Sequence, residues 1–211
     1  TWPVRTSRRG CNDPPVPEAR SELFRRLSVV IVTYGAARDI PQCLELLPWR
    51  HLGALVIVDN DSPDDTVQVV RALGLQGLTL LQRQNTGFGS GLNAGVAVLP
   101  PSVEFVLLLN PDARISPDSL VTLVEELEQR PRCALLGPLL TRADRVHFSA
   151  GRLPTLTSEI TPLLPGGLSR WLPRRRIDPS RLVDGPVGYV EGACMLVRRE
   201  AFESVGGFDE T

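Results

Sequence analysis

The chain has 211 residues, 42% of them hydrophobic, and a formal net charge of −1. This size and composition suit one globular domain with a sizeable core, and no apolar run approaches the roughly 20 residues that cross a bilayer. The balanced charge excludes a global field that would steer the chain to nucleic acid or to an anionic membrane, so recognition of a charged ligand must be local.

A tail, a strand and a helix are predicted at the start of the chain. Residues 1–26 are rich in Pro and Arg and lack the apolar core of a signal peptide, which predicts a disordered or linker-like tail. Residues 27–33 form a β-branched apolar run without polar alternation, the pattern of a strand buried on both faces of a parallel sheet. Apolar residues at helical spacing follow over 36–47.

Strands and helices continue to alternate. Residues 54–58 are a second buried strand. Ser62 is predicted to cap a helix, because Pro63 suits its first turn, and this helix is expected to reach about Leu73. Residues 78–81 are a third strand candidate.

A glycine-rich turn, NTGFGSG, leads into a helix predicted over 92–98. A fourth strand follows over 105–109, a helix over 116–129 and a strand over 134–140. Residues 141–186 carry many Pro, Gly and Arg residues, which predicts a long irregular insertion.

Strand-like sequence returns over 187–197, and 199–204 is a short helix. Strands that alternate with helices predict an α/β fold with a mainly parallel sheet flanked by helices. In such sheets, ligands bind outside the carboxyl ends of the strands.

Polar residues follow four of the predicted strands at this edge. They are Thr33-Tyr34-Gly35, Asp59-Asn60-Asp61, Gln84-Asn85-Thr86-Gly87 and Asn110-Pro111-Asp112. Hard divalent cations bind through one or two carboxylates plus phosphate oxygens, so Asp112 is a candidate metal ligand for a diphosphate. Asn110 would be its hydrogen-bonding neighbour. The alternative is a turn acid, because N-P-D is also good turn chemistry.

Two further strand ends carry candidate ligand contacts. Asp59 could accept hydrogen bonds from a base or a ribose, and the alternative is a turn acid ahead of Ser62. The glycines of residues 85–95 let backbone N–H groups approach phosphates near a helix N-terminus. The run 89–94 also matches the dinucleotide fingerprint G-x-G-x-x-A, with Asp112 near the expected offset. This fingerprint usually marks the first strand of a domain, whereas here it follows the third.

Five segments, in this order, resemble the successive motifs of family 2 glycosyltransferases, and are most similar to the rhamnosyltransferase-like branch. They are VVIVTYGA, VIVDNDSPDDT, QNTGFGSGLNAG, VLLLNPDARISP and VEGACMLVRREAFESVGGFDE. The resemblance spans residues 27–211 and implies a GT-A fold, in which a Rossmann-like nucleotide-binding half joins an acceptor-binding half. It also implies a dTDP- or UDP-sugar donor, with rhamnose favoured, and a divalent cation, Mg²⁺ or Mn²⁺.

The resemblance assigns site residues position by position. Those expected around the nucleotide-sugar are Thr33, Tyr34, Gly35, Asp59, Asn60, Asn85, Gly87, Phe88, Gly89, Asn93, Asn110 and Asp112. The expected wall near donor sugar and acceptor is Glu191, Gly192, Ala193 and Cys194. Asn110 stands where the family has the first Asp of its D-x-D motif, which leaves Asp112 as the implied metal ligand.

The implied reaction is a single displacement with inversion, onto a saccharide or polyprenyl-linked acceptor in cell-wall or surface polysaccharide synthesis. The family's general base lies in an E-D motif soon after GGFDE, which places it beyond Thr211. Residues 1–211 are therefore expected to bind nucleotide yet transfer little or no sugar, and robust transfer by this chain would contradict the expectation.

Other signals bear on location and on rival functions. The four cysteines form no CxxC pair, which predicts reduced, mostly buried thiols in a cytosolic protein. The basic run 170–176 is typical of a solvated loop, and its alternative is peripheral contact with a membrane or an anionic polyprenyl-diphosphate acceptor. Two rival functions stay open, namely a nucleotide-binding oxidoreductase module and a non-catalytic nucleotide-sugar-binding domain.

Overall fold

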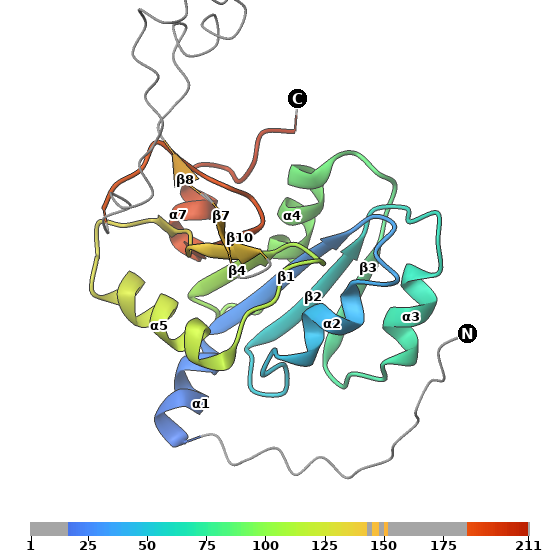
Figure 1. Ribbon diagram of the computed structural model, residues 1–211, viewed down its shortest axis with the longest axis horizontal. Helices are drawn as coiled ribbons and strands as arrows, with labels where there is room; N and C mark the ends of the chain where they lie inside the picture. The colour runs from blue at the N-terminus through green and yellow to red at the C-terminus, as the bar shows by residue number, and fades with distance from the viewer. Residues whose placement is uncertain (1–16, 143–144, 148–149, 152–184, 211) are drawn as a thin grey trace, which may run out of the picture.

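A six-stranded sheet forms the middle layer of the protein (Figure 1). The computed structural model describes residues 17–142, 145–147, 150–151 and 185–210. The strands lie in the order β3-β2-β1-β4-β10-β5. Their bounds are β1 Leu27–Thr33, β2 Ala54–Asp59, β3 Leu78–Gln82, β4 Phe105–Leu109, β5 Leu135–Leu136 and β10 Cys194–Arg198. The first four strands are mutually parallel, whereas β10 runs antiparallel to both β4 and β5.

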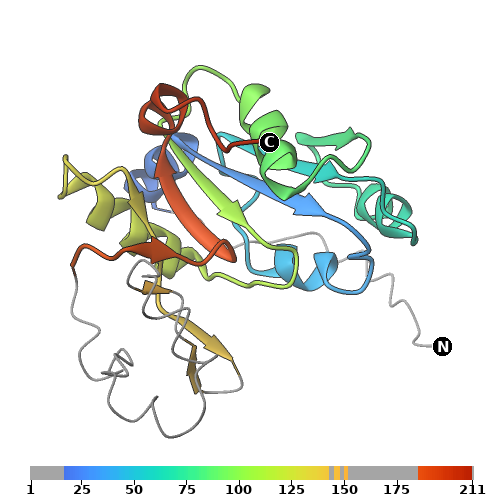
Figure 2. The same ribbon diagram turned by 90° about the horizontal axis from the view of Figure 1, so that it is seen from above.

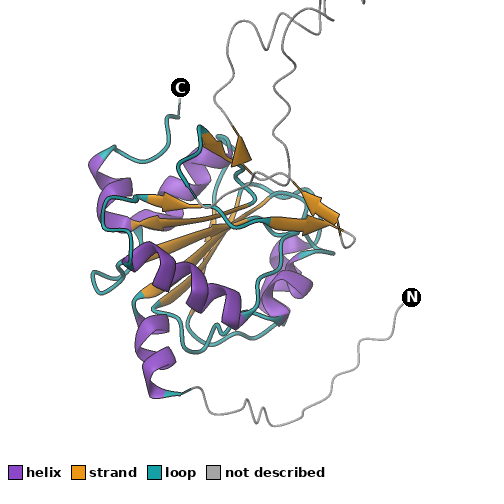
Figure 3. Ribbon diagram, turned by 60° about the vertical axis from the view of Figure 1, so that its left-hand side comes forward, coloured by secondary structure: helices purple, strands orange, loops and turns teal. Residues whose placement is uncertain are grey.

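Helices cover both faces of this sheet (Figure 3). Their bounds are α1 Glu18–Arg25, α2 Ile40–Glu45, α3 Thr66–Ala72, α4 Phe88–Ala97, α5 Pro117–Glu128 and α7 Arg199–Ser204. Alternate residues of β1 serve the two faces, because Val29 and Ile31 pack with α2 and α5 while Val30 and Val32 pack with α4. All seven residues of β1 and all five of β4 are buried, which explains their unbroken apolar sequences. The predicted α/β fold with a mainly parallel sheet is confirmed.

Two small two-stranded sheets correct the prediction that residues 141–186 are irregular throughout. They pair β6 Leu140–Arg142 with β7 Arg145–His147, and β8 Ala150–Gly151 with β9 Tyr189–Val190. Strands β6, β7 and β8 lie in or at the start of that range. The strand predicted over 134–140 is therefore interrupted between β5 and β6, and the one predicted over 187–197 is divided between β9 and β10. Most of the predicted insertion, including the basic run 170–176, lies outside the described residues, as do Cys11 and the start of the tail. No helix in the described part of the chain is long and apolar enough to cross a membrane.

Helix α1 corrects the predicted tail over residues 18–25. Its Phe24 side chain is 1% exposed and belongs to the core cluster beneath α2 and α5. The Pro and Arg content of residues 1–26 predicts a tail. The buried Phe24 instead anchors α1, the helix near the end of this range, to the core. The division of the chain at residue 26 as a domain boundary stays a prediction.

Helix α4 begins at Phe88, four residues before the predicted start at Leu92. Glycines at the start of this helix obscured it, since glycine lowers helix propensity by about 1 kcal/mol relative to alanine. Close packing explains them. A Cβ at Gly95 would lie 2.4 Å from Cγ1 of Val30, and one at Gly91 would lie 2.9 Å from Cγ1 of Val32. Gly91 and Gly95 therefore allow α4 to approach β1 closely at two successive turns.

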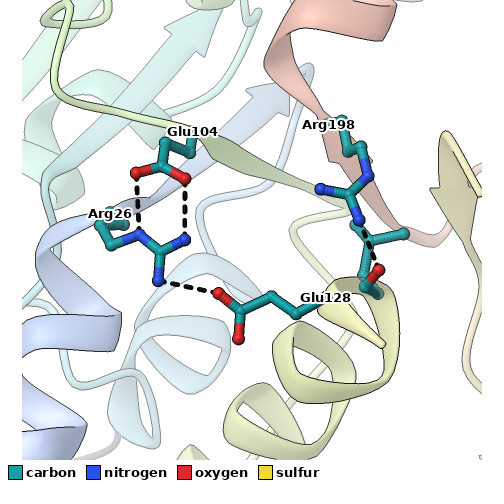
Figure 4. A network of polar contacts seen from close by, with 5 residues as sticks. Arg26, Glu104, Glu128 and Arg198 are labelled. Atoms are coloured by element: carbon teal, nitrogen blue, oxygen red, sulfur yellow. Dashed lines mark hydrogen bonds and ion pairs between the residues drawn. The ribbon is translucent and has the colours of Figure 1, made fainter. Parts of the chain in front are cut away.

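A polar network lies where β1 and β4 begin and the antiparallel β10 ends, opposite the edge where ligands are expected (Figure 4). Arg26 donates from Nε to Glu104 Oε1 over 2.9 Å and from its terminal nitrogen to Oε2 over 2.7 Å. It also lies 2.8 Å from a carboxylate oxygen of Glu128, on α5. Arg26 and Arg198 both lie over the Phe105 ring, at 5.3 and 5.6 Å from its centroid. The network joins β1, β4, β10 and α5.

Glu104→Gln should cost about 0.5–1 kcal/mol of unfolding free energy at neutral pH, a small value because the Arg26 and Glu104 side chains are 31% and 55% exposed. The Arg26 guanidinium holds the pKa of Glu104 below its usual range. The ion pair therefore contributes above the ordinary pKa of glutamate, and its contribution is lost as pH falls through the lowered folded-state pKa. Urea unfolding of both proteins across pH should show the difference shrinking in acid. A difference that grows in acid would contradict this assignment.

Candidate functional site

The carboxyl ends of β1 and β4 meet where the strand order changes direction. The chain moves from β1 outward to β2 and β3, then returns to place β4 on the other side of β1. The parallel register sets Thr33 opposite Asp59, and Ile31 opposite Leu109, the residue before Asn110. In open α/β sheets this switch point is where ligands bind. The predicted polar strand ends therefore converge on one edge of the sheet (Figure 2).

Asp59 is held by neighbours within the protein. Its side chain is 2% exposed, and Oδ1 accepts a hydrogen bond from Thr33 Oγ1 over 3.1 Å. Ser62 supplies two more donors, its backbone N–H to Oδ2 over 3.1 Å and its hydroxyl to Oδ1. The predicted cap role of Ser62 is thus corrected, since α3 begins at Thr66 with Asp65 as its N-cap. Asp59 links the ends of β1 and β2 and retains limited capacity for a ligand.

The loop after β1 is fastened to the loop after β2 by three backbone N–H groups. Gly35 donates to Ser62 Oγ over 3.0 Å, Ala36 to Thr66 Oγ1 over 2.8 Å and Ala37 to Asp64 Oδ2 over 3.2 Å. Hydrogen bonds from the Thr66 hydroxyl and from backbone N–H groups lower the pKa of Asp64. Gly35 has a φ of +68°, a conformation that favours glycine.

Tyr34 stands on this fastened loop with its side chain 60% exposed. A large exposed aromatic beside a rigid loop presents a flat surface on which a base can stack. Tyr34 thus lies at the edge where the sequence places the nucleotide pocket.

Asn60 connects the β2 end to the glycine-rich loop. Its Nδ2 donates to Gly87 O over 3.0 Å, while its Oδ1 is buried and has no hydrogen-bond partner among the described residues. Gly87 has a φ of +107° and donates from its N–H to Asn85 Oδ1 over 3.1 Å. The predicted residues Asn60, Asn85 and Gly87 are therefore brought together, and one buried oxygen among them is left to accept a hydrogen bond.

Asn110 and Asp112 offer two oxygen donors at the end of β4. Asn110 Oδ1 is buried without a hydrogen-bond partner in the described part of the chain, and the Asp112 side chain is exposed. An amide oxygen and a carboxylate are ligands that Mg²⁺ and Mn²⁺ accept, so these residues fit a hard divalent cation. Among the described residues, no cluster of three or more His, Cys, Asp or Glu could hold a metal ion by itself. Substrate phosphates commonly complete such a shell.

The predicted wall, residues 191–194, lies directly beside this pair. Asn110 donates from its backbone N–H to Ala193 O over 2.9 Å, and Cys194 pairs with Leu109 across the antiparallel β10–β4 ladder. A Cβ at Gly192 would lie 3.7 Å from Cε1 of Phe88, whose ring is 42% exposed. The wall thus bridges the β4 end and the start of α4. Glu191 lies at its outer end, half-buried.

The two buried thiols near Asn110 are chemically quiet. Burial raises the pKa of Cys43 to about 12, with a further contribution from the charge of Asp112, and burial alone raises the pKa of Cys194 to about 12. Thiols with such pKa values stay protonated at neutral pH and are poor nucleophiles. They pack as small hydrophobic side chains, as the sequence predicts.

Asn93 departs from its predicted place on the nucleotide. Its side-chain amide is bonded instead to the backbone of Phe208 and to Glu210. Gly89, also predicted to border the nucleotide, faces Phe208, because a Cβ there would lie 3.0 Å from the Cβ of Phe208. These two positions line the contact between α4 and the last described residues, which sequence proximity does not reveal.

Sequence reasoning placed Thr86 at this edge but missed Arg83, Ser90 and the contacts that join the three residues. Arg83 donates to Ser90 O over 2.7 Å and to Ser90 Oγ over 3.1 Å, and the Thr86 hydroxyl donates to Ser90 Oγ over 2.9 Å. Together Arg83, Thr86 and Ser90 brace the glycine-rich loop. The only local signal for them was their position within or next to that loop.

A hollow elsewhere on the molecule has a different character. It encloses about 270 Å³ between α3 and the edge strand β3. Its lining residues are Val70, Arg71, Gly74, Leu75, Leu78 and Leu80. Arg71 is already bonded to Gln82 Oε1 over 2.7 Å. None of these lining residues has a carboxylate or amide side chain, in contrast to the carboxyl edge of the sheet.

The amino-acid sequence is similar to those of named proteins. The chain is 32% identical over 205 residues to the N-acetylglucosaminyl-diphospho-decaprenol L-rhamnosyltransferase of Mycobacterium tuberculosis (strain ATCC 25618 / H37Rv), which covers 87% of this chain and 65% of that protein. It is 28% identical over 190 residues to Rhamnosyltransferase WbbL of Escherichia coli (strain K12), covering 86% and 70% respectively. The chain therefore spans about two thirds of the length of these relatives.

Solved structures share the fold. The mannosyltransferase PcManGT of Pyrobaculum calidifontis, in complex with GDP-Man and Mn²⁺, aligns with a TM-score of 0.57 at 21% identity, over 88% of this chain and 48% of that one. S. aureus TarS aligns with a TM-score of 0.56 at 19% identity, over 88% and 50%. These likenesses confirm the GT-A fold. Residues 28–206 match the sequence model of Glycosyl transferase family 2. With this match, the shared fold and the ordered strand ends, the chain belongs to glycosyl transferase family 2.

Proposed function

We propose that this chain binds the donor in an inverting transfer of a sugar, rhamnose in the first instance, from a dTDP- or UDP-sugar to a saccharide or lipid-linked acceptor. One observation carries the proposal. The buried Asn110 amide oxygen, which has no hydrogen-bond partner among the described residues, lies with the exposed carboxylate of Asp112 at the switch point of the sheet, beside the wall of residues 191–194. A diphosphate with its cation requires this kind of oxygen-rich site.

Each part of the site has a role in this proposal. Tyr34 offers its ring to the base. Asn60 offers to a ligand N–H its Oδ1, which has no hydrogen-bond partner in the part of the chain that the structure describes. Asp59 keeps the β1 and β2 ends together through Thr33 and Ser62. Asn110 and Asp112 would hold Mg²⁺ or Mn²⁺, and the bound cation would supply positive charge to the leaving diphosphate.

Relatives support the choice of sugar and acceptor. Both curated relatives described above are named rhamnosyltransferases, and the mycobacterial one is named for an N-acetylglucosaminyl-diphospho-decaprenol acceptor. A related acceptor for this protein would be anchored in a bilayer by its lipid. The proposed location is therefore the cytoplasm, with peripheral contact at the inner face of the membrane and a role in cell-wall or surface polysaccharide synthesis.

Titration with thymidine diphosphate and uridine diphosphate, with and without Mn²⁺, tests the proposal. We expect Mn²⁺ to tighten binding about tenfold or more, equivalent to at least about 1.4 kcal/mol. NADH and NADPH serve as the comparison ligands. Tight binding of a nicotinamide cofactor, indifferent to Mn²⁺, would overturn the proposal in favour of an oxidoreductase module. Metal-dependent binding that is equally tight for the nucleoside diphosphates and for NADH and NADPH would also count against it.

A further inference from the structure

The Asn93 side chain forms hydrogen bonds with the backbone of a segment that lies more than a hundred residues away in the sequence. Its Oδ1 accepts a hydrogen bond from the Phe208 N–H over 2.9 Å, and its Nδ2 donates to Phe208 O over 2.8 Å. Nδ2 also donates to Glu210 Oε1 over 2.7 Å. One amide thus satisfies both backbone groups of a single residue and a neighbouring carboxylate. In Figures 1 and 2, the C-terminal segment lies beside α4.

The segment is shaped for this contact. Gly206 and Gly207 have φ values of +81° and +78°, which only glycine adopts without strain. A Cβ at Gly207 would lie 2.4 Å from Asn93 Oδ1, so the approach itself requires glycine there. Phe208 is anchored by an edge-to-face contact with Phe202 on α7, with ring centroids 5.6 Å apart. The turn, the anchor and the amide hold residues 206–210 in one place.

That place is the start of the glycine-rich helix. Gly89 lies against Phe208, and on the other side of α4 Gly91 lies against β1 and Asn60. Helix α4 carries no acidic residue in its first turn and no side-chain cap at its N-terminus. Glu210 brings a carboxylate to this positive end. Hydrogen bonds from Asn93 and then Ser90, together with the charge of Arg83, lower the pKa of Glu210.

We propose that Asn93 is a positioning residue that fixes Gly206–Glu210 against the glycine-rich loop and so makes this acidic segment part of the rim of the donor site. The catalytic meaning of this inference rests on the proposed function. The contacts on which the inference is based do not depend on the proposed function, because they lie within the protein. Asn93 therefore acts on the site through residues 206–210 rather than by touching the nucleotide.

Amide hydrogen exchange in the protein tests the clamp directly. Replacing Asn93 by Ala removes the acceptor of the Phe208 N–H and both donors, so exchange at Phe208 should accelerate about tenfold or more. The Leu107 amide, in the central strand β4, reports on global unfolding in the same sample and should be unaffected. Thr122→Ala, which removes a hydroxyl-to-backbone hydrogen bond on α5, is the matched control and should leave Phe208 unchanged. Unaltered exchange at Phe208 in the Asn93→Ala protein would overturn the proposal.

A second, isosteric variant covers the case in which Asn93→Ala does not fold. Asn93→Asp retains an oxygen for the Phe208 N–H but sets a carboxylate against Phe208 O and against Glu210. Exchange at Phe208, normalised to intrinsic rates, should accelerate at neutral pH and slow again in acid. The Glu210 carboxyl resonance should titrate with a higher pKa in both variants than in the unmodified protein, a shift that loss of packing elsewhere would not cause. A Glu210 titration that is identical in all three proteins would contradict the proposal.

The nucleotide titration in the same samples separates this inference from the proposed function. Absence of nucleoside diphosphate binding by the unmodified protein, with accelerated exchange in Asn93→Ala, would refute the proposed function and leave the clamp established. Metal-dependent binding without any exchange difference would support the transferase and refute the role of Asn93.

Discussion

Asp112→Ala is expected to reduce thymidine diphosphate binding in Mn²⁺ to its metal-free level, a loss of about 10- to 100-fold, or about 1.4–2.8 kcal/mol. The carboxylate is exposed at the end of β4, two residues after Asn110, whose buried Oδ1 has no hydrogen-bond partner within the described ranges. It is the only carboxylate of the N-P-D turn, so its removal leaves the amide oxygen as the sole side-chain ligand in that turn. Calorimetric titration with and without Mn²⁺ measures both affinities.

The folded state should survive this substitution. Exposed positions away from caps and networks usually change stability by less than about 0.5 kcal/mol, so a lost affinity would not reflect unfolding. Asp118→Ala on α5 is the matched control, because Asp118 is an exposed carboxylate (78%) that forms an ion pair with Arg20. It should leave the Mn²⁺ dependence intact. An Asp112→Ala protein that still binds more tightly in Mn²⁺ would show that the cation is held elsewhere.

Asp59→Ala is expected to lower the free energy of unfolding by about 3 kcal/mol, because hydrogen bonds to a charged acceptor contribute about 1.5–3 kcal/mol each. Both donors of Ser62 lose their acceptor, and the hydroxyl of the fully buried Thr33 is left with its longer, 3.4 Å contact to Val58 O. The total stays below the sum of the separate bonds, since half-buried Ser62 can turn to water. Urea denaturation at neutral pH, with an unchanged slope, measures the loss.

The same loop supplies the control for this prediction. Asp65→Ala makes the same chemical change at an exposed N-cap whose side chain forms no cap hydrogen bond, and should cost less than about 0.5 kcal/mol. A loss below about 1 kcal/mol for Asp59→Ala would mean that the carboxylate does not organise the strand ends. It would then be available to a ligand in the way that the sequence alone predicts.

Local sequence determined the framework of the fold. The apolar runs at 27–33 and 105–109 coincide with β1 and β4, because strands buried on both faces leave no polar alternation. Ser116 caps α5 by accepting a hydrogen bond from the Ser119 N–H, as its position before Pro117 predicts. Strand ends in a parallel sheet share an edge, so the gathering of polar residues there also followed from order along the chain.

Local sequence failed where packing outweighed propensity. Helix α1 forms in Pro- and Arg-rich sequence because Phe24 is buried in the core. Helix α4 extends through glycines because their missing side chains let it approach β1. In both cases, packing against another element stabilises the helix by more than the low helix propensity of the segment destabilises it.

Only the tertiary structure decided which polar groups form hydrogen bonds with each other. The sequence predicts Ser62 as a helix cap. Because β1 and β2 end side by side, Ser62 instead forms hydrogen bonds with Asp59 and Gly35. Asn93 reads as a nucleotide contact, but the fold places Phe208 against it. Patterns of a few residues record burial and local backbone preference. A hydrogen bond between groups distant in the chain depends on how the sheet and its helices bring them together, so the sequence determined the family and the edge of the site, and the fold determined the partners of Asp59 and Asn93.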